Sequence, residues 1–441
     1  MSLNEDQNRV FNLFKNGKSL FITGPGGCGK SFLLKHIKDY CDQHMINIAV
    51  TALTGCAGSL IGGQTLHGWG GLGLAKESAP DLVRKINKKP PLAKRWRAVK
   101  VLIIDEVSMM SMELFNKIHL IAQGLRHNDL FFGGIQVILC GDFAQLDPIG
   151  SDRFCFESKV WERYIEPNTV YLSKIVRQED PVFQKILMNL RLGNLSEDDK
   201  DVLNSRIIRD EKDSEVSVSD GTHEIGTIKA TLLYPLKKDV SRINKTELQK
   251  LINQDKKMHT YNAFDFATNR KTKTPVTLKE IHTDTLNKCI NVPQNIELTI
   301  GSQVMLTKNI SVEEGLVNGS RGVVIDINEL NYPIVMFDNG QQLTITVESF
   351  EIESGDILLT RKQIPLLLAW ALTIHKCQGA TLTNVITDLS DIFGYAQAYV
   401  TLSRVKSLEG LFIKSINYKK IRCNPKVKSY YTRITCIKCN N

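Results

Sequence analysis

The stretch SLFITGPGGCGKS, residues 19–31, decides the fold. A short apolar run ends at Thr23, a glycine-rich turn follows, and an apolar pattern with helical spacing begins at Phe32. The turn GPGGCGKS has the spacing of a phosphate-binding P-loop, which joins a buried strand to a helix. Its glycines let backbone N–H groups face an oxyanion, and the following helix adds positive potential at the same point. The stretch predicts a nucleoside triphosphate site in which Lys30 reaches the β- and γ-phosphates and Ser31 holds magnesium, the alternative being a chance glycine turn.

Composition sets broad limits on the protein. A chain of 441 residues is long enough for two to three domains, each with its own core. An apolar content of 42% and a charged content of 23% are those of an ordinary globular protein. The formal net charge of +9 permits a polyanionic partner without establishing one.

Cysteines and the chain ends indicate the compartment. The ten cysteines are scattered and mostly lie in apolar runs, which is typical of free thiols in a reducing compartment. The opening MSLNEDQNRVF resembles neither an export nor a transit peptide, and the longest apolar run, 364–374, is too short to span a bilayer. We therefore expect an intracellular location: cytoplasm, nucleoid or nucleus.

Cys436 and Cys439 form a CxxC motif near Cys423, and no histidine follows His375. Because a structural zinc site would lack a fourth ligand, this pattern favours a loose tail.

The first segments surround the P-loop. Residues 4–14 read as a helix with Asn4 as N-cap, in which Gln7 serves as a capping side chain or contacts a purine edge. Residues 46–52 are a buried-strand candidate. The next segment, TGCAGSLIGGQTLHGWGGLG (54–73), is too glycine-rich for a plain helix and indicates a loop close to a ligand, or else a surface excursion. The basic run 85–100 is interpreted first as a solvated face.

Two further strand candidates end in polar residues. Residues 101–104 are apolar and are followed by Asp105 and Glu106, which can hold magnesium and activate the attacking water; simple strand-end caps are the alternative. Residues 132–140 form the next candidate, and Gln145 follows it at a position where an amide can sense the γ-phosphate. The repeated strand–turn–helix order predicts a parallel, doubly wound sheet with ligands at the carboxyl ends of its strands.

The second half repeats this style around a different insert. Residues 169–180 begin a new unit, in which Arg177 and Gln178 are expected to open a helix, and 209–226 read as a polar surface insert. From about 300 the chain shows short alternating strands with glycine turns, typical of a small β-barrel. The α/β style returns over 365–407 without a second P-loop, which suggests one nucleotide held between two lobes.

The order of these motifs carries a resemblance. The series GPGGCGKS, TGCAGSLIGGQTLHGWGG, IIDEVSM, FGGIQVILCGDFAQL, LSKIVRQ, WALTIHKCQGATL and YVTLSRV resembles superfamily-one helicases. In detail it is similar to the Pif-one (petite integration frequency) family of DNA helicases, class B and related to the RecD-like enzymes. The match runs from Gln7 to about Arg404.

The resemblance implies a role for each matching residue. The expected catalytic residues are Lys30, Glu106, Gln145 and two arginine fingers, Arg177 and Arg404. The expected nucleotide contacts are Gln7, which would touch adenine, and Gly24, Pro25, Gly26, Gly27, Cys28, Gly29, Lys30, Ser31 and Gly379. Ser31 and Asp105 would bind Mg²⁺. The expected contacts to the nucleic-acid backbone are Thr54, Gly55, His67, Thr373, His375 and Lys376.

The implied fold is α/β, with two RecA-like parallel-sheet lobes of the P-loop NTPase class. The expected boundaries are 1–165 for the first lobe, with a small wedge-like segment at 55–76; 166–299 and 361–441 for the second lobe and tail; and 300–360 for an SH3-like β insert. The chain departs from the family pattern at Gly68, Ala144, Asp147, Cys377 and Thr401, none of which removes a phosphate ligand. Trp69 is interpreted either as a fork wedge or as packed core.

The implied function is an ATP- and Mg²⁺-dependent 5′-to-3′ DNA helicase. It would translocate on single-stranded DNA and unwind forks, RNA–DNA hybrids and possible G-quadruplexes, as a monomer in solution without a membrane partner, with roles in DNA repair, replication, recombination and telomere maintenance. One alternative is a single-strand translocase that does not separate strands. Another is an ATP-switched DNA-binding protein, which would not need Glu106 or two arginines. A small-molecule P-loop kinase is disfavoured by the length, the β insert and the motif order.

Overall fold

The first lobe is built on a six-stranded parallel sheet. The structure, a computed structural model, describes residues 3–148, 150–209, 216–219, 224–234, 237–270, 272–311, 313–354, 357–374 and 380–439. The sheet has the strand order β3-β2-β4-β5-β1-β6. Its members are β1 (Leu20–Thr23), β2 (Ile48–Ala52), β3 (Gln64–Thr65), β4 (Val101–Asp105), β5 (Gln136–Cys140) and β6 (Thr169–Tyr171). All of its pairings are parallel, so every strand ends at the same edge.

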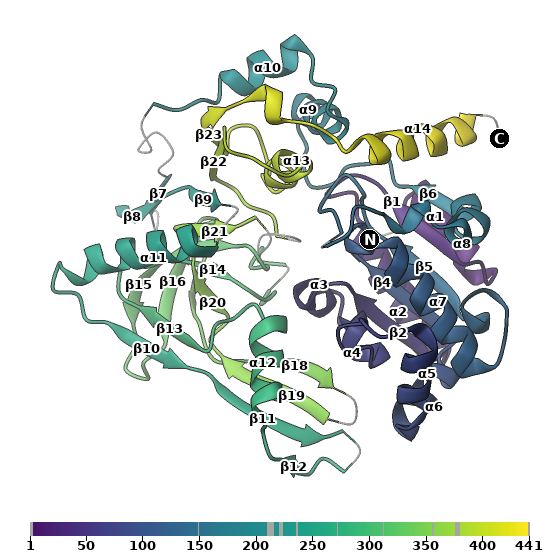
Figure 1. Cartoon of the computed structure of the whole chain (residues 1–441). Helices are drawn as coiled ribbons and strands as arrows, with labels where there is room; N and C mark the ends of the chain where they lie inside the picture. The colour runs from purple at the N-terminus through teal and green to yellow at the C-terminus, as the bar shows by residue number, and fades with distance from the viewer. Residues whose placement is uncertain are drawn as a thin grey trace.

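Helices cover both faces of this sheet (Figure 1). The helices are α1 (Glu5–Lys15), α2 (Lys30–Gln43), α3 (Gly55–Leu60), α4 (Leu66–Gly70), α5 (Ala79–Asn87), α6 (Pro90–Ala98), α7 (Met112–Arg126) and α8 (Lys159–Tyr164). Alternate residues of β4 face opposite cores: Ile103 packs with α1 and α2, whereas Leu102 and Ile104 pack with α4 to α8. The continuous apolar run therefore reflects burial on both sides.

The second lobe has its own parallel sheet, in the order β21-β9-β22-β23. Its strands are β9 (Thr231–Tyr234), β21 (Ala371–Thr373), β22 (Val385–Leu389) and β23 (Leu411–Ile416). The accompanying helices are α9 (Pro181–Leu192), α10 (Glu197–Asn204), α11 (Lys237–Ile252) and α13 (Gln397–Leu402). The expected α/β class with two parallel sheets is confirmed.

A β-rich insert separates β9 from β21 in sequence. A five-stranded antiparallel sheet has the order β17-β16-β15-β14-β20, and a four-stranded sheet has the order β12-β11-β19-β18. The strands are β10 (His259–Asn262), β11 (Phe264–Asn269), β12 (Pro275–Val276), β13 (Asn295–Leu298), β14 (Gln303–Leu306), β15 (Arg321–Ile327), β16 (Pro333–Phe337), β17 (Gln342–Thr344), β18 (Glu348–Ser354), β19 (Ile357–Gln363) and β20 (Leu366–Leu368). Helix α12 (Glu280–Cys289) falls between β12 and β13 in sequence, and β7 (Val216–Ser219) pairs antiparallel with β8 (Glu224–Ile228) in a separate two-stranded sheet.

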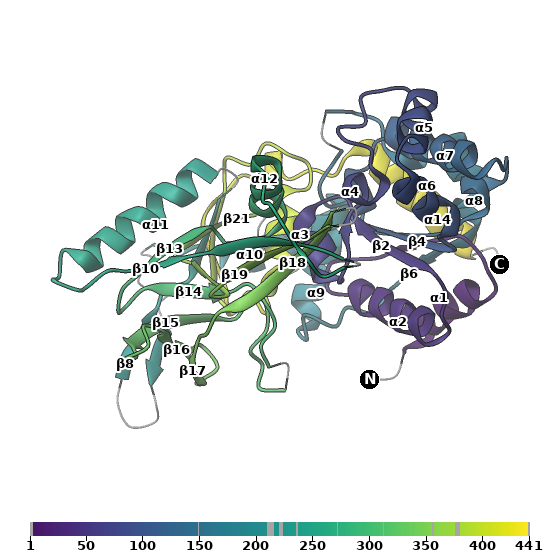
Figure 2. The same ribbon diagram turned by 90° about the horizontal axis from the view of Figure 1, so that it is seen from below.

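The expected boundaries need three corrections. The first sheet extends beyond 165, because β6 pairs with β1. The β insert begins at β10 and ends at β20 rather than spanning 300–360, because strands on both sides of that range pair within it: β11 with β19, and β14 with β20. Helix α14 (Pro425–Cys439) follows the second lobe in sequence but packs on the first, as both views show (Figures 1 and 2).

The docking of α14 depends on two adjacent tyrosines. The Tyr431 hydroxyl lies 2.8 Å from the hydroxyl of Thr23, at the end of β1. The Tyr430 ring stacks on Phe156 with 4.4 Å between centroids, and its hydroxyl accepts a hydrogen bond from Trp161 Nε1 at 3.3 Å. The chain therefore crosses between the lobes twice, once after β6 and again before α14.

Local elements also differ from expectation. The glycine-rich segment forms two short helices and the edge strand β3, not only a loop. The strand expected over 132–140 starts at Gln136, because Phe132 and Gly133 have positive φ angles of 49° and 62° inside a 3-10 turn. Arg177 and Gln178 lie before α9, whose N-cap is Asp180. Within the described part of the chain, no helix combines the length and apolar character needed to cross a bilayer.

Candidate nucleotide site and DNA-binding surface

The P-loop connects β1 to α2 in a conformation that needs its glycines. Gly24, Gly27 and Gly29 have φ angles of 146°, 79° and 85°, which residues with a Cβ atom rarely adopt. A Cβ on Gly24 would lie 2.4 Å from the Leu172 carbonyl oxygen, and one on Gly27 would lie 2.5 Å from Arg177 Cβ. The segment after β6 therefore packs directly on this loop, and the strand–loop–helix prediction is confirmed.

Lys30 is the first residue of α2, and its ammonium group folds over the loop. Lys30 Nζ donates to the carbonyl oxygens of Gly24 and Pro25, both at 2.8 Å. Burial acts to lower the pKa of Lys30, but the groups around it, Cys28 and Asp142 first among them, outweigh this effect and the net pKa is raised. Lys30 thus keeps its charge. Ser31 is exposed beside it, at the first turn of α2.

Gln7 combines the two roles that the sequence left open. Its Oε1 accepts from the Asn4 backbone N–H at 3.0 Å, which completes a capping box at the start of α1. Its Nε2 would lie 2.8 Å from a Cβ on Gly29. The capping role is confirmed, and the amide nitrogen also borders the P-loop, where an adenine contact stays a prediction.

Two carboxylates end β4 beside the loop. The Glu106 backbone N–H donates to Asp105 Oδ1 at 2.8 Å, and Glu106 adopts a left-handed conformation with φ 56° and ψ 41°. Backbone strain of this kind is concentrated at functional sites. Burial, followed by the neighbouring Asp105 charge, raises the pKa of Glu106 to about 7. Burial likewise raises the pKa of Asp105. A carboxylate with a pKa near neutrality suits a general base.

Gln145 and the two arginines meet at the seam between the lobes. Arg404 Nη2 donates to Gln145 Oε1 at 3.3 Å, and both residues are buried. Arg177 Nη1 donates to the Ser403 carbonyl at 2.9 Å, and the Val176 backbone N–H donates to the Gly27 carbonyl at 2.9 Å. Burial, then the nearby Arg404 charge, lowers the pKa of Arg177 to about 9. Residues more than 200 positions apart thus converge on the P-loop.

The sequence interpretation missed a buried cluster next to this seam. Arg191 Nη2 donates to Asp142 Oδ1 at 2.7 Å, and Arg191 Nε lies 3.1 Å from both carboxylate oxygens. The hydroxyl of Tyr431 donates to Asp142 at 3.0 Å, and that of Tyr399 at 3.3 Å. The position of Asp142 at a strand end, three residues before Gln145, was the available signal. Tyr431 carried no such signal.

The predicted DNA contacts fall into three groups. Thr54 accepts from the Ala57 backbone N–H at 3.2 Å as the cap of α3, and His67, partly buried on α4, has its pKa lowered by burial. A Cβ on Gly55 would lie 2.4 Å from Cys289 Cα, so α12 covers this position. Thr373 is buried at the end of β21. His375, Lys376 and Gly379 lie outside the described residues.

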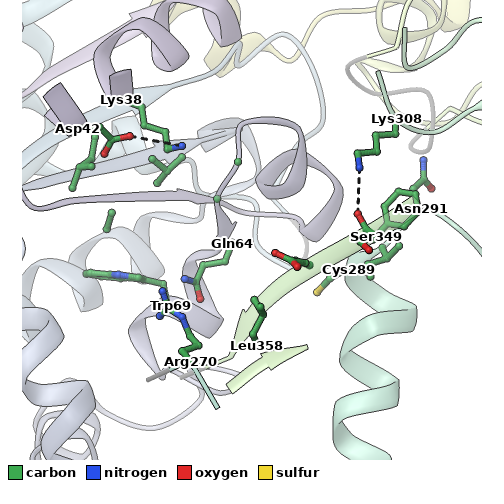
Figure 3. Close-up of a pocket in the computed structure, with 18 of the residues that line it drawn as sticks. Lys38, Asp42, Gln64, Trp69, Arg270, Cys289, Asn291, Lys308, Ser349 and Leu358 are labelled. Atoms are coloured by element: carbon green, nitrogen blue, oxygen red, sulfur yellow. Dashed lines mark hydrogen bonds and ion pairs between the residues drawn. The ribbon is translucent and has the colours of Figure 1, made fainter. Parts of the chain in front are cut away.

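Trp69 is part of the first-lobe core. Its side chain is 4% exposed, and its ring centroid lies 4.6 Å from that of Trp96. The Trp69 carbonyl also accepts from Arg95 Nη1 at 3.0 Å. This burial supports the packed-core interpretation of Trp69, although the residue also lines the cavity shown in Figure 3; the wedge interpretation stays a prediction.

A cavity of about 810 Å³ lies between the first lobe and the insert (Figure 3). Its lining includes four cationic side chains: Lys38, Arg95, Arg270 and Lys308. Lys38 pairs with Asp42 at 4.0 Å, and Lys308 pairs with Glu348 at 2.7 Å and also donates to the Ser349 carbonyl at 3.3 Å. None of the P-loop residues lines the cavity. Two acidic side chains, Asp42 and Glu351, also line the cavity, so its lining has a net positive charge and lies apart from the nucleotide site.

Comparison with known proteins identifies the family. The family model described as "PIF1-like helicase" matches residues 2–201, and the model for the 2B domain of DNA helicase Pif1 matches residues 283–327. An uncharacterized protein of Invertebrate iridescent virus 6 is 34% identical over 98% of this chain and 94% of its own length. The human ATP-dependent DNA helicase PIF1 is 37% identical over 98% of this chain, which spans 64% of the human protein's length.

Solved structures of Pif1 helicases are similar to this chain over nearly its whole length, and the similarity is lower for an ssDNA-bound form. Pif1 helicase from Candida albicans is 35% identical, with a TM-score of 0.74 over 98% of this chain and 100% of that one. Unliganded Pif1 from Bacteroides sp. is 26% identical, with a TM-score of 0.78 over 99% and 97% of the two chains. The same helicase bound to ssDNA gives 0.61 over 100% and 98%. Together with the geometry of the P-loop and its two arginines, these matches place the chain in the PIF1-like helicase family of ATP-dependent DNA helicases.

Proposed function

We propose that this PIF1-like helicase moves 5′-to-3′ along single-stranded DNA and separates the strands of forked DNA. The observation that carries the proposal is the position of Arg177 and Arg404. Arg177 lies on the segment that joins β6 to the second lobe and packs on Gly27, and Arg404 comes from the second lobe and donates to Gln145. A chemical change at the phosphates therefore acts on both lobes at once.

The residues at this seam have complementary tasks in hydrolysis. Glu106 takes a proton from the attacking water, and Gln145 orients that water beside the γ-phosphate. The guanidinium groups of Arg177 and Arg404 stabilise the negative charge that develops on the transferred group. Ser31 and Asp105 supply the oxygen ligands that Mg²⁺ prefers, and magnesium bound there would neutralise phosphate charge.

Movement on DNA follows if the lobes close and open once per ATP. Arg404 reaches the nucleotide site from the second lobe, so an interaction between this arginine and the phosphates would couple lobe position to the bound nucleotide. Opening one base pair costs about 1.4 kcal/mol of stacking on average, which is modest for one closure. A protein that binds single-stranded DNA of any sequence does so mainly through cations that contact the phosphates. The cationic side chains around the 810 Å³ cavity therefore suit a binding path for the DNA strand.

The insert also covers Gly55, an expected DNA contact that does not line this cavity. Helix α12 covers Gly55 through Cys289, so a strand that contacts Gly55 must displace α12. The TM-score is 0.61 against ssDNA-bound Bacteroides Pif1 and 0.78 against the unliganded protein, so the arrangement of this chain is more similar to the unliganded one. RNA–DNA hybrids and G-quadruplexes are further proposed substrates, and DNA repair, replication, recombination and telomere maintenance are proposed settings. We propose a monomer in solution.

A fork assay tests the proposal. Duplexes with a 5′ tail and duplexes with a 3′ tail are incubated with ATP and magnesium, with Glu106→Gln as the matched inactive control. We expect strand separation from the 5′-tailed fork only. DNA-stimulated hydrolysis without strand separation would favour the translocase alternative, and an absence of turnover in the natural chain would favour the ATP-switched binding protein. Unwinding from the 3′ tail would contradict the proposed direction.

A further inference from the structure

One contact at the P-loop has no part in the mechanism above. The backbone N–H of Gly26 donates to the hydroxyl oxygen of Tyr399, on α13, at 2.8 Å. The same hydroxyl donates to Asp142 at 3.3 Å. A Cβ on Gly26 would meet Ser403 Cβ and Oγ at 3.3 Å and the Tyr399 hydroxyl at 3.7 Å. The second lobe thus sits directly on the part of the loop that faces phosphate in P-loop proteins.

Tyr399 presents an oxygen where a phosphate oxygen is expected. Backbone N–H groups of a P-loop cradle the phosphates, and Gly26 uses its N–H for the Tyr399 oxygen instead. Lys30 similarly donates to loop carbonyls rather than to an anion. A triphosphate that uses these donors must therefore replace protein acceptors, one of which belongs to the opposite lobe.

The hydroxyl is held in a fixed protonation state. Tyr399 is 2% exposed, and burial followed by the Asp142 charge raises its pKa well above the usual range. It therefore stays a neutral acceptor for Gly26 and a donor to Asp142. Asp142 in turn accepts from Arg191 on α9 and Tyr431 on α14. The Tyr399 oxygen thus connects Gly26 to helices α9, α13 and α14 and to the segment after β5 that carries Asp142.

We propose that Tyr399 is a positioning residue that occupies Gly26 N–H in place of a phosphate oxygen, so that nucleotide entry releases α13 from the P-loop. Because Arg404 lies two residues beyond the end of α13, the release re-aims the arginine toward the phosphates. The inference rests on the proposed ATP-driven closure and names the contact through which the phosphates are sensed. It also implies that Tyr399 opposes binding, unlike a phosphate ligand, which would favour it.

The test measures nucleotide affinity without DNA. Tyr399→Phe keeps the buried ring and removes the oxygen. A fluorescent non-hydrolysable ATP analogue with Mg²⁺ should bind the variant more tightly, with a Kd lower by about fivefold, the effect of one net hydrogen bond. Tyr430→Phe is the control, because it also loses a buried hydroxyl, one that bonds Trp161 instead of the P-loop. Unchanged or weaker binding by Tyr399→Phe would overturn the proposal.

If Tyr399→Phe folds poorly, fluorine NMR of the otherwise natural chain tests the release of Tyr399 instead. A single 3-fluorotyrosine is placed at position 399 of the otherwise natural chain, and the same label at position 430 serves as control. Saturating analogue should shift the fluorine resonance at 399 and leave the one at 430 in place; no shift at 399 would refute the release. Failure of the fork assay with tighter binding by Tyr399→Phe would refute the unwinding proposal and leave this one standing.

Discussion

The buried pair of Arg191 and Asp142 allows a quantitative prediction for Arg191→Met. Their side chains are 1% and 0% exposed, and the arginine makes contacts of 2.7, 3.1 and 3.1 Å to the carboxylate. Methionine fills much of the same volume without charge. The variant therefore leaves the Asp142 carboxylate charged, buried and without its cation.

Breaking a buried ion pair by removing one partner costs about 3–5 kcal/mol of unfolding free energy. Asp142 keeps three other donors: the hydroxyls of Tyr399 and Tyr431 and the backbone N–H of Ala144. We therefore expect a loss of about 3 kcal/mol, at the lower end of that range. Adding Asp142→Asn removes the unpaired charge and should restore most of the stability, which a double-mutant cycle will measure.

Urea unfolding followed by tryptophan fluorescence is a suitable assay. Trp69, Trp96 and Trp161 all lie in the first-lobe core, so their emission follows the part of the molecule that contains Asp142. A loss below about 1 kcal/mol for Arg191→Met, the value of a surface pair, would refute the reasoning. So would a double variant no more stable than the single one.

The pH dependence gives an independent check on the same pair. Burial acts to raise the pKa of Asp142, but the Arg191 charge and hydrogen bonds outweigh it, and the net pKa is lowered. A lowered carboxyl pKa stabilises the fold above the unfolded-state value of about 3.9, and this contribution is lost as the pH falls through the folded-state pKa. In Arg191→Met the burial effect loses its main counterweight, so the pKa of Asp142 should be higher than in the natural chain and its carboxyl should take up a proton at higher pH. The stability difference between the two proteins should therefore be largest at neutral pH and should shrink as the pH falls and Asp142 of the variant becomes protonated.

Further predictions concern the site and its surroundings. Glu106→Gln should lower ATP turnover by about 10²–10⁴-fold while sparing ATP binding. Because burial and the Asp105 charge raise the pKa of Glu106 to about 7, turnover of the natural chain should fall as the pH drops below that value. A flat pH–rate profile would contradict the role of Glu106 as general base. Arg404→Ala should reduce kcat by about 10³-fold with a much smaller effect on KM for ATP, as steady-state kinetics will measure; a change confined to KM would argue against an arginine finger. Trp69→Ala should cost about 3–5 kcal/mol of stability in a urea titration and should not affect unwinding selectively; a loss of unwinding with unchanged stability would favour the wedge interpretation. Lys308→Ala should weaken ssDNA binding and make the dependence of log K on log salt shallower by about 0.7, as a fluorescence titration will test; an unchanged slope would place the strand elsewhere.

Local sequence determined the chemistry of the first lobe. The glycines of residues 24–29, the lysine that opens α2 and the acidic pair that ends β4 are fixed by short-range geometry, because each needs only a strand, a turn and a helix in order. The capping box of Asn4 and Gln7 is local for the same reason. The order of the motifs along the chain indicates the family, and the resemblance to that family implies the roles of Arg177 and Arg404.

Only the tertiary structure decided how distant segments meet. Tyr431 reaches Thr23 across more than 400 residues, and Tyr399 reaches Gly26 across more than 370, so no periodicity or spacing could show these contacts. The same holds for the insert, whose edges are set by strand pairs such as β11 with β19 rather than by a change in composition. Burial of Trp69 against Trp96 likewise depends on two helices packing together. Sequence supplies the groups and their local conformations; which of them become neighbours is settled by the packing of whole elements around shared cores.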